Sequence, residues 1–300
     1  MTFKKLNIFL LFLFQLLLFL SAESREIQER DKTGSENNKA SVIKLADSIY
    51  RITFPYSLRP NIAALTGSEG VLLVDTGHQE TAEELISKVE DFKSGDLKYI
   101  INTHLHGDHA GGNLLVGKKA EIIHYQNLKE LVTRGVLRLV EEERKEMATN
   151  LSGEYYALNF NREKIKIIPY PGVHSGNDLI IYFSTSGVAH MGDLLLTQSF
   201  PAVGPKVQEY LEFLEKVMVS FPPNTKFIGG HGRDYSKEDL KKYHQMLLTT
   251  IKIVRLEMKK GKSVEEIKSA NVLERWKSWG EFLTFLNTDY WIGAICKSYE

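Results

Sequence analysis

The stretch Asn102-Thr103-His104-Leu105-His106-Gly107-Asp108-His109-Ala110-Gly111-Gly112 directly follows an apolar segment that predicts a buried strand. Three of the nine histidines of the chain fall within it. At the end of an extended strand, His104 and His106 are two residues apart and project to the same side, where two imidazoles can bind one ion. Gly107 is expected to allow a tight bend that brings Asp108 and His109 to a second position beside the first. The stretch therefore predicts a loop that binds metal ions.

Further ligands are expected at later strand ends. His174 lies in Pro171-Gly172-Val173-His174-Ser175, Asp193 in Ala189-His190-Met191-Gly192-Asp193, and His231 in Ile228-Gly229-Gly230-His231-Gly232. Each comes just after an apolar run, with glycine close by to let the backbone approach a site. A chance histidine-rich surface loop would not be accompanied by such residues, so we interpret them as additional metal ligands.

Together these residues resemble the ligand set of the metallo-β-lactamase superfamily. The run from His104 to His109 is similar to the family's HxHxDH motif, and His174, Asp193 and His231 match its later ligands in order. The resemblance covers about Val42 to Asp234 and includes the turn Asp75-Thr76-Gly77. It implies an α/β (α+β) fold, an αββα sandwich of two mixed β-sheets flanked by helices, with the metal site along one edge.

The resemblance also implies a role for each ligand. It places one metal ion on His104, His106 and His174, a second on Asp108, His109 and His231, and the carboxylate of Asp193 between them. Two zinc ions per chain are expected, with manganese or iron as alternatives that the donor types also allow. A metal-bridging hydroxide would then attack the substrate, with Asp108 as the catalytic residue that orients it.

Other polar residues are expected to have lesser roles. Asp75 is interpreted either as a residue that holds the imidazole of a ligand or as an ordinary turn residue. His78, His124, His190 and His244 have no matching position in the motif and are not expected to bind metal.

The activity expected from the resemblance is that of an exported dinuclear-zinc metallohydrolase that cleaves a small ester, thioester, lactone or cyclic amide such as a β-lactam. The zinc β-lactamases with a cysteine ligand carry it near the position of Asp193, and Cys296 is too distant to replace it, which disfavours β-lactams as the main substrate. Two alternatives remain: a mononuclear-iron sulfur dioxygenase that uses His106, His174 and Asp193, and a non-catalytic metal-binding protein.

The amino-acid composition limits the classes of binding partner that are expected. Of 300 residues, 43% are hydrophobic and 25% charged, as in a soluble globular protein with a sizeable core. Lys and Arg number 38, as do Asp and Glu, so there is no basic excess to bind nucleic acid, and a small-molecule substrate is expected. The segment Leu194 to Pro205 is either an apolar loop beside the site or a loop packed on its own helix.

The N-terminus has the pattern of a signal peptide at residues 1–22. Lys4 and Lys5 precede an apolar run from Leu6 to Leu20, which is short for a membrane span of about 20 residues. Cleavage is expected after Ala22, and an uncleaved anchor is the alternative and the only membrane contact foreseen. A polar, disordered linker is expected over 23–41. Export to a bacterial periplasm is favoured, with secretion as the alternative, and the single Cys296 is expected to pack as a small apolar residue.

The remaining pattern predicts a metallo-β-lactamase-like domain over 42–235 and a helical extension over 236–300. Capping boxes at Ser236 with Asp239 and at Ser263 with Glu266 begin two C-terminal helices. These helices are expected to pack on the domain, or alternatively to form the arm of a homodimer. Strands are expected at 48–54, 62–66, 71–74, 97–102, 120–124, 164–168, 179–183, 188–191 and 226–229, and helices at 80–93, 128–149 and 206–219.

Overall fold

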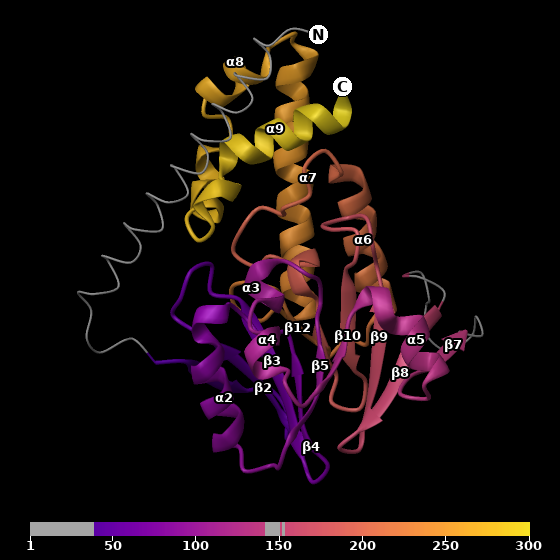
Figure 1. Ribbon diagram of the computed structural model, residues 1–300. Coiled ribbons are helices and arrows are strands. Elements are labelled where there is room, and N and C mark those ends of the chain that lie inside the picture. The colour runs from indigo at the N-terminus through magenta and orange to yellow at the C-terminus, as the bar shows by residue number, and fades with distance from the viewer. Residues whose placement is uncertain (1–38, 142–150, 152–153) are drawn as a thin grey trace, which may run out of the picture.

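The computed structural model describes residues 39–141, 151 and 154–300. The expected signal peptide and most of the expected linker lie outside these residues. Within them, the strands form two sheets, and each sheet is built from one continuous stretch of the sequence (Figure 1).

The first sheet contains strands from the first half of the chain in simple sequence order. Its members are β1 (Ser41–Lys44), β2 (Ile49–Thr53), β3 (Asn61–Gly67), β4 (Gly70–Val74), β5 (Leu97–Ile101) and β6 (Glu121–Ile123). The strands from β1 to β4 pair antiparallel, whereas β4, β5 and β6 pair parallel, so the sheet is mixed. Because β1 begins at Ser41, the expected linker ends one residue too late.

The second sheet repeats this arrangement in the later stretch of the chain, from β7 to β12. Its order is β12 (Lys226–Ile228), β11 (Val188–His190), β10 (Leu179–Phe183), β9 (Glu163–Pro169), β8 (Glu154–Phe160) and β7 (Arg138–Glu141). β11 and β12 are parallel, and the other pairs are antiparallel. Two mixed sheets of six strands with flanking helices confirm the αββα sandwich that the sequence resemblance implies.

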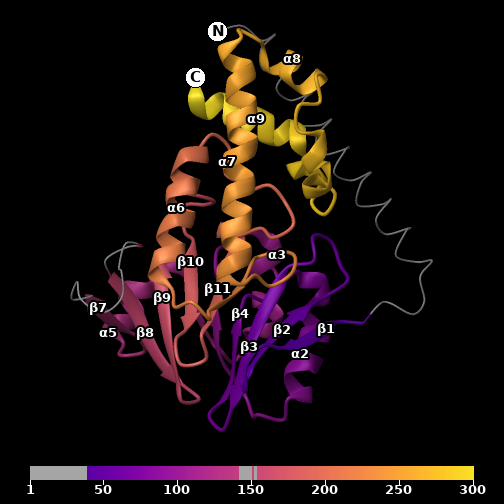
Figure 2. The same ribbon diagram turned by 180° about the vertical axis from the view of Figure 1, so that it is seen from behind.

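Helices cover the outer faces of the two sheets (Figures 1 and 2). The α-helices are α2 (Ala82–Asp91), α3 (Gly107–Ala110), α4 (Asn113–Val116), α5 (Leu128–Thr133), α6 (Val207–Ser220), α7 (Lys237–Lys259), α8 (Val264–Ser269) and α9 (Thr288–Tyr299). Short 3₁₀ helices lie at Gln79–Thr81, Tyr125–Asn127, Gly192–Leu194, Glu274–Gly280 and Thr284–Leu286.

The alternation of side chains along the strands divides the core into layers. In β3, Ala63 and Leu65 face the second sheet, where they belong to one cluster with Ile167 and Ile181. Ile62, from the other face of β3, packs with residues of α2. Successive residues of a strand point to opposite faces, so a strand with apolar residues on both faces must lie between two layers. The sequence of β3 therefore places it between a helix and a sheet.

The C-terminal helices pack on α6 and on the outer face of the second sheet. Figures 1 and 2 both show α7 rising from the sheets to α8 and α9.

The C-terminal helices also show two features that the sequence predicts. Ser236 accepts a hydrogen bond from the backbone of Asp239, whose carboxylate accepts one in return, which confirms the predicted capping box. Trp291 is fully buried and donates its indole N–H to Thr250 Oγ1 at 2.9 Å. Cys296 is 1% exposed in the same cluster, as its packing role predicts.

One predicted helix is wrong. The helix expected over 128–149 ends at Thr133, and Arg138–Glu141 forms β7 instead; residues 142–149 lie outside the described part. Gly135 has φ of 75° and its N–H bonds to the carbonyl of Val132, which ends the helix with a left-handed turn. β8, which pairs with β7, was not predicted, although its buried residues Tyr156, Leu158 and Phe160 alternate along the strand.

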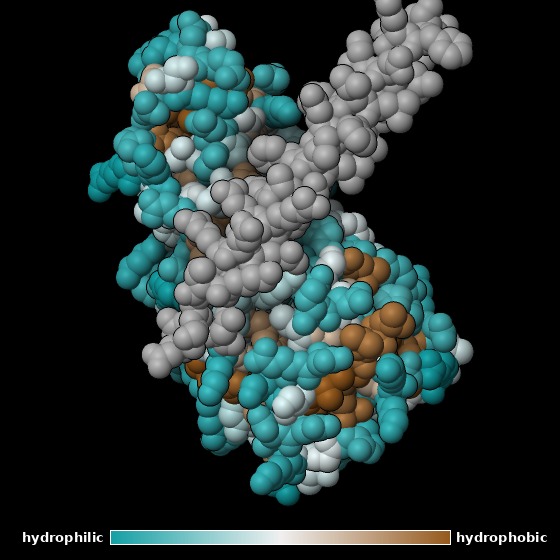
Figure 3. Space-filling model, turned by 60° about the vertical axis from the view of Figure 1, so that its left-hand side comes forward, coloured by the Kyte–Doolittle hydropathy of each residue, from teal (hydrophilic) through white to brown (hydrophobic). Residues whose placement is uncertain are grey.

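The surface is mainly hydrophilic on the face shown in Figure 3, with hydrophobic residues gathered on the lower part of that face. No helix among residues 39–141 and 154–300 combines the length and the apolar character that a membrane span requires.

Candidate metal centre

The predicted ligands lie where parallel strands end. His104 comes shortly after β5, Asp193 after β11, and His231 after β12. The carboxyl ends of parallel strands meet at the same edge of a sheet. Because the two sheets pack face to face, the centre is assembled from the edges of both, with His174 added by the turn between β9 and β10.

A first group of four ligand atoms comes from His104, His106, His174 and Asp193, and all four lie within 4.8 Å of one another. Nδ1 of His106 is 2.9 Å from Nε2 of His104 and 3.3 Å from Nε2 of His174. Three ring nitrogens thus converge on one point. Three imidazoles are a donor set that suits a tetrahedral metal site with one open position.

A second group comes from Asp108, His109 and His231 and meets the same limit of 4.8 Å. The Nε2 atoms of the two histidines are 3.4 Å apart. Oδ2 of Asp108 lies 3.3 Å from Nε2 of His231 and 3.6 Å from Nε2 of His109. The structure therefore brings all seven predicted ligands together, in the two groups that the resemblance implies.

The carboxylate of Asp193 joins the two groups. Its Oδ2 lies 3.5 Å from Nε2 of His174 in the first group, and its Oδ1 lies 3.2 Å from Nε2 of His109 in the second. Oδ1 is buried and accepts no hydrogen bond from the described residues. A buried carboxylate oxygen without a donor is costly unless a cation neutralises it. The donor set therefore fits a pair of metal ions with Asp193 between them.

Gly230 leaves the space that this carboxylate occupies. A Cβ atom at Gly230 would lie 1.9 Å from Oδ1 of Asp193, which is far inside van der Waals contact.

Gly107 differs from the prediction, because its φ is not positive and a Cβ atom there would meet nothing within 4 Å. The bend that presents Asp108 and His109 comes instead from the start of the short helix α3.

Backbone carbonyls fix the orientation of two ligand rings. Nδ1 of His231 donates to the carbonyl oxygen of Leu58 at 2.7 Å, and Nδ1 of His174 donates to that of Ala202 at 3.1 Å. A carbonyl oxygen only accepts hydrogen bonds, so each ring carries a proton on Nδ1 and turns Nε2 toward the centre, where its lone pair is available once the ring is neutral.

Asp75 has the same function for His109, as one of its two interpretations predicts. Oδ2 of Asp75 accepts a hydrogen bond from Nδ1 of His109 at 2.8 Å, and both side chains are fully buried. The backbone N–H and the hydroxyl of Thr103 also donate to this carboxylate, each at 2.7 Å. Thr103 Oγ1 lies 3.1 Å from Nδ1 of His104 as well, so one buried network supports a ligand from each group.

The charges of the centre are strongly coupled. Burial lowers the pKa of His104 to about 3, which keeps its ring neutral and available as a ligand. Burial also disfavours a charge on His231, but Asp193 and Asp108 outweigh it and raise its pKa to about 9. For Asp193, the imidazoles of His231 and His109 outweigh burial and hold its pKa well below the ordinary value. The carboxylates thus remain ionised and require positive charge beside them.

The centre is accessible at three of its ligands. His104, His109 and His231 are at most 2% exposed, whereas His106 is exposed and Asp108 and His174 are half-buried. Substrate and water therefore have access from the side of these last three residues.

The segment 194–205 lies beside the site, as one of its two interpretations predicts, but its large apolar side chains are buried in the core. Phe200 is fully buried and stacks on Trp291 with ring centroids 5.7 Å apart, and Val203 is 5% exposed. The loop contributes to the centre through the carbonyl of Ala202.

Histidines without a motif position lie outside both groups, as expected. His78 bonds to the carbonyl of Ser57, and His190 to that of Asn61. Sequence reasoning did not identify the supporting roles of Leu58, Thr103 and Ala202, since two of them act through backbone carbonyls that leave no signal in the sequence.

Comparison with known proteins gives the family. The sequence profile of the metallo-beta-lactamase superfamily matches residues 58–231, which include all seven ligands. The chain belongs to this superfamily. It is a metal-dependent hydrolase of that fold with an intact His/Asp metal-binding site.

Two curated relatives of this superfamily member share part of its sequence. It is 28% identical over 164 residues to a hydroxyacylglutathione hydrolase of Pelagibacter ubique (strain HTCC1062), covering 53% of this chain and 61% of that protein. It is 25% identical over 242 residues to the beta-lactamase-like protein 2 homolog of Caenorhabditis elegans, covering 76% of each chain.

Solved structures agree on the fold. A metallo-beta-lactamase from Pontibacter korlensis superposes with a TM-score of 0.53 at 16% identity, covering 70% of this chain and 99% of that one. A metallo-beta-lactamase from Hirschia baltica gives a TM-score of 0.52 at 18% identity, covering 69% and 97%. At such identities the likeness shows the metallo-beta-lactamase fold alone.

Proposed function

We propose that the protein is a dinuclear-zinc hydrolase of small esters, thioesters, lactones or cyclic amides. The observation that carries the proposal is the position of Asp193, whose two carboxylate oxygens face different ligand groups. Such a carboxylate favours two ions over one. When bound, a pair of zinc ions supplies a hydroxide nucleophile near neutral pH and polarises the substrate's carbonyl group.

Asp108 is proposed as the catalytic residue. Its Oδ2 faces His109 and His231, whereas its Oδ1 has no partner among the described residues. Oδ1 can therefore accept a hydrogen bond from the attacking water and pass the proton toward the leaving group. Because Asp108 lies on the open side, it can contact both the water and the substrate.

The mononuclear-iron alternative would use His106, His174 and Asp193 alone. It leaves His109 and His231 converged on Asp193 without a function, so it has less support. A non-catalytic role is disfavoured by the open side of the centre, because a structural site encloses its metal.

Metal content tests the proposal directly. The protein is purified without chelator, and zinc, manganese and iron are measured by elemental analysis. About two zinc ions per chain and hydrolysis of at least one lactone, thioester or aryl ester support it. One iron per chain, or no metal after zinc is supplied, contradicts it.

Export to a periplasm and a small-molecule substrate remain part of the proposal. The pattern at residues 1–22 supports export, and the balance of 38 basic and 38 acidic residues supports a partner other than nucleic acid. Intact-mass measurement on fractionated cells tests export, since an exported chain should lack residues 1–22.

A further inference from the structure

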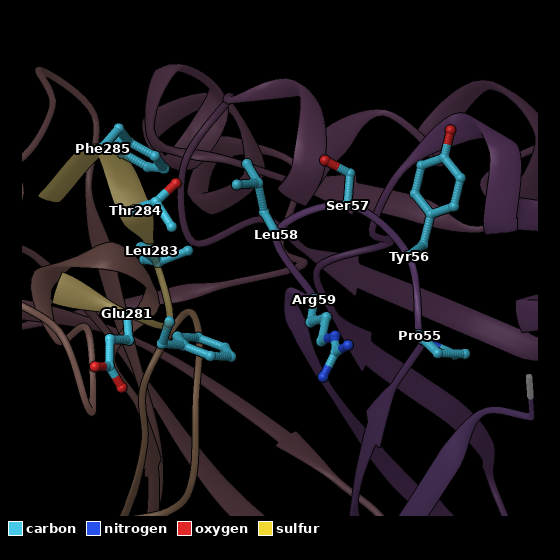
Figure 4. A pocket seen from close by; sticks show the side chains of 10 residues that line it. Pro55, Tyr56, Ser57, Leu58, Arg59, Glu281, Leu283, Thr284 and Phe285 are labelled. Carbon is cyan, nitrogen blue, oxygen red and sulfur yellow. The ribbon is translucent and has the colours of Figure 1, made fainter. Parts of the chain in front are cut away.

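A pocket of about 410 Å³ lies between two segments that are far apart in the sequence, residues 55–59 and 281–285 (Figure 4). The first segment connects β2 with β3, and the second leads into the last helix. Leu58 lines this pocket, and its carbonyl oxygen also holds the ring of His231. Leu58 therefore links the pocket to one ligand ring of the metal centre.

The pocket contains two opposite charges that the protein leaves unused. Arg59 and Glu281 are both exposed, and neither forms an ion pair or a side-chain hydrogen bond with any residue in the described ranges. In Figure 4 their charged ends point in the same general direction, away from the side on which Leu58 and Phe285 lie. The pocket thus carries both charges on one side, whereas Leu58, Phe285 and the hydroxyls of Ser57 and Thr284 lie on the other.

The backbone of the loop that carries Arg59 is held in a fixed shape. Leu58 and Arg59 both have left-handed backbones, with φ of 59° and 49°, which residues other than glycine rarely adopt. The loop keeps this shape because the ring of His78 bonds to the carbonyl of Ser57 and the N–H of Arg59 bonds to that of Tyr56. Backbone strain that is maintained in this way is typical of ligand-binding loops.

We propose that this pocket binds a zwitterionic, amino-acid-like end of the substrate. The guanidinium of Arg59 receives the carboxylate, for which its paired N–H groups are shaped, and Glu281 receives the ammonium group. The apolar body of the substrate lies against Leu58 and Phe285, and the scissile bond extends to the metal centre. The inference rests on the proposed function, because it names the substrate class of the same hydrolytic site.

The kinetic test uses aryl acetates that carry the ammonium group, the carboxylate, both or neither. O-Acetyl-L-tyrosine is the zwitterion, its N-acetyl derivative lacks the ammonium group, its methyl ester lacks the carboxylate, and phenyl acetate lacks both. With the zinc-loaded full chain, Arg59→Gln should raise KM about tenfold for the two esters with a carboxylate. Glu281→Gln should do so for the two with an ammonium group, and kcat should change less than about twofold in both variants.

The matched control is Arg162→Gln. Arg162 is also an exposed arginine with a left-handed backbone, with φ of 64°, but it lies in the turn between β8 and β9. This variant should leave every KM unchanged. If Arg59→Gln and Glu281→Gln raise KM for phenyl acetate as much as for O-acetyl-L-tyrosine, or for no ester, the two charges have no recognition role and the inference is wrong.

A binding measurement separates this inference from the proposed function. L-Phenylalanine is added to the metal-free full chain and followed by saturation-transfer NMR, with N-acetylphenylalanine amide as the uncharged comparison. Binding of phenylalanine but not of the uncharged amide, lost in Arg59→Gln and retained in Arg162→Gln, supports the pocket as a binding site. This holds even if no ester is hydrolysed. Hydrolysis of esters without selective binding or any charge dependence of KM supports the hydrolase and overturns the pocket.

Discussion

Oδ2 of Asp75 lies 2.8 Å from Nδ1 of His109, and neither side chain has any exposed surface. Asp75 does not face the metal position, yet it sets the orientation of a ring that does. Asp75→Asn keeps the shape but removes the charge, so we expect zinc affinity at the second group to fall about 10- to 100-fold. Competition with a chromogenic chelator measures this, and Asp47→Asn, on an exposed turn, is the control. Equal affinity in Asp75→Asn and the wild type would contradict the role.

Asp108→Ala should lower kcat/KM on a good ester substrate by about a thousandfold, because it removes both a ligand atom and the group that orients the nucleophile. His244→Ala is the control, since the ring of His244 lies near Glu215 and outside both ligand groups. Turnover within about threefold of the wild type in Asp108→Ala would show that Asp108 is not catalytic. A large loss in His244→Ala would mean that a ligand has been missed.

Gly230→Ala should displace the carboxylate of Asp193, because the new Cβ atom would lie 1.9 Å from Oδ1. We expect bound zinc to fall from about two ions per chain to one or fewer, as measured by elemental analysis. Gly107→Ala is a matched control within the ligand motif, since its Cβ atom meets nothing within 4 Å. If Gly230→Ala binds the full complement of zinc, Asp193 does not join the two groups as described.

The buried ring of His190 should make the metal-free protein sensitive to acid. Burial lowers the pKa of His190 to about 4, so between pH 6.5 and 4 the unfolded chain binds a proton that the folded chain does not. Its contribution to stability is present above pH 6.5 and is lost as the pH falls toward 4, by about 3 kcal/mol in total. Urea unfolding across this range should show a shallower acid limb in His190→Gln than in the wild type. An identical limb in both would assign the effect to other groups.

Metal removal should destabilise the fold, because the ligands come from both sheets. At a free zinc concentration about a thousandfold above Kd, binding stabilises the folded state by about 4 kcal/mol. For a chain of this size, that corresponds to a rise in Tm of about 6 °C. Calorimetry with zinc and with chelator measures the difference, and a Tm that does not respond to zinc would refute metal binding by the folded state.

The ligands could be predicted from the sequence because they come soon after apolar segments, and because their order resembles the motif of the family. His104 and His106 belong to one group although both lie beyond the end of β5. The residues whose carbonyls orient the ligand rings could not be predicted from the sequence. Leu58 and Ala202 act through carbonyls, and only the folded chain brings them beside His231 and His174.

The sequence predicted an element well where its structure depends on residues close together in the chain. The capping boxes at Ser236 and Ser263 form as expected, because both partners lie within one turn of helix. The helix prediction for the segment after Thr133 was wrong. The charged residues there have good helix propensity, whereas the strand at Arg138–Glu141 depends on pairing with β8. Tertiary pairing decided that structure, and no local pattern reports it.

Each sheet comes from one continuous stretch of the chain, and this has a consequence for how the protein is made. The earlier stretch supplies residues 104–109 of the centre, and the later one supplies residues 174, 193 and 231. A ribosome adds residues from the N-terminus onward, so four ligands are synthesised before their partners. Loading of both metal positions therefore has to wait until translation has passed residue 231, and a truncated product ending before it would leave an incomplete centre.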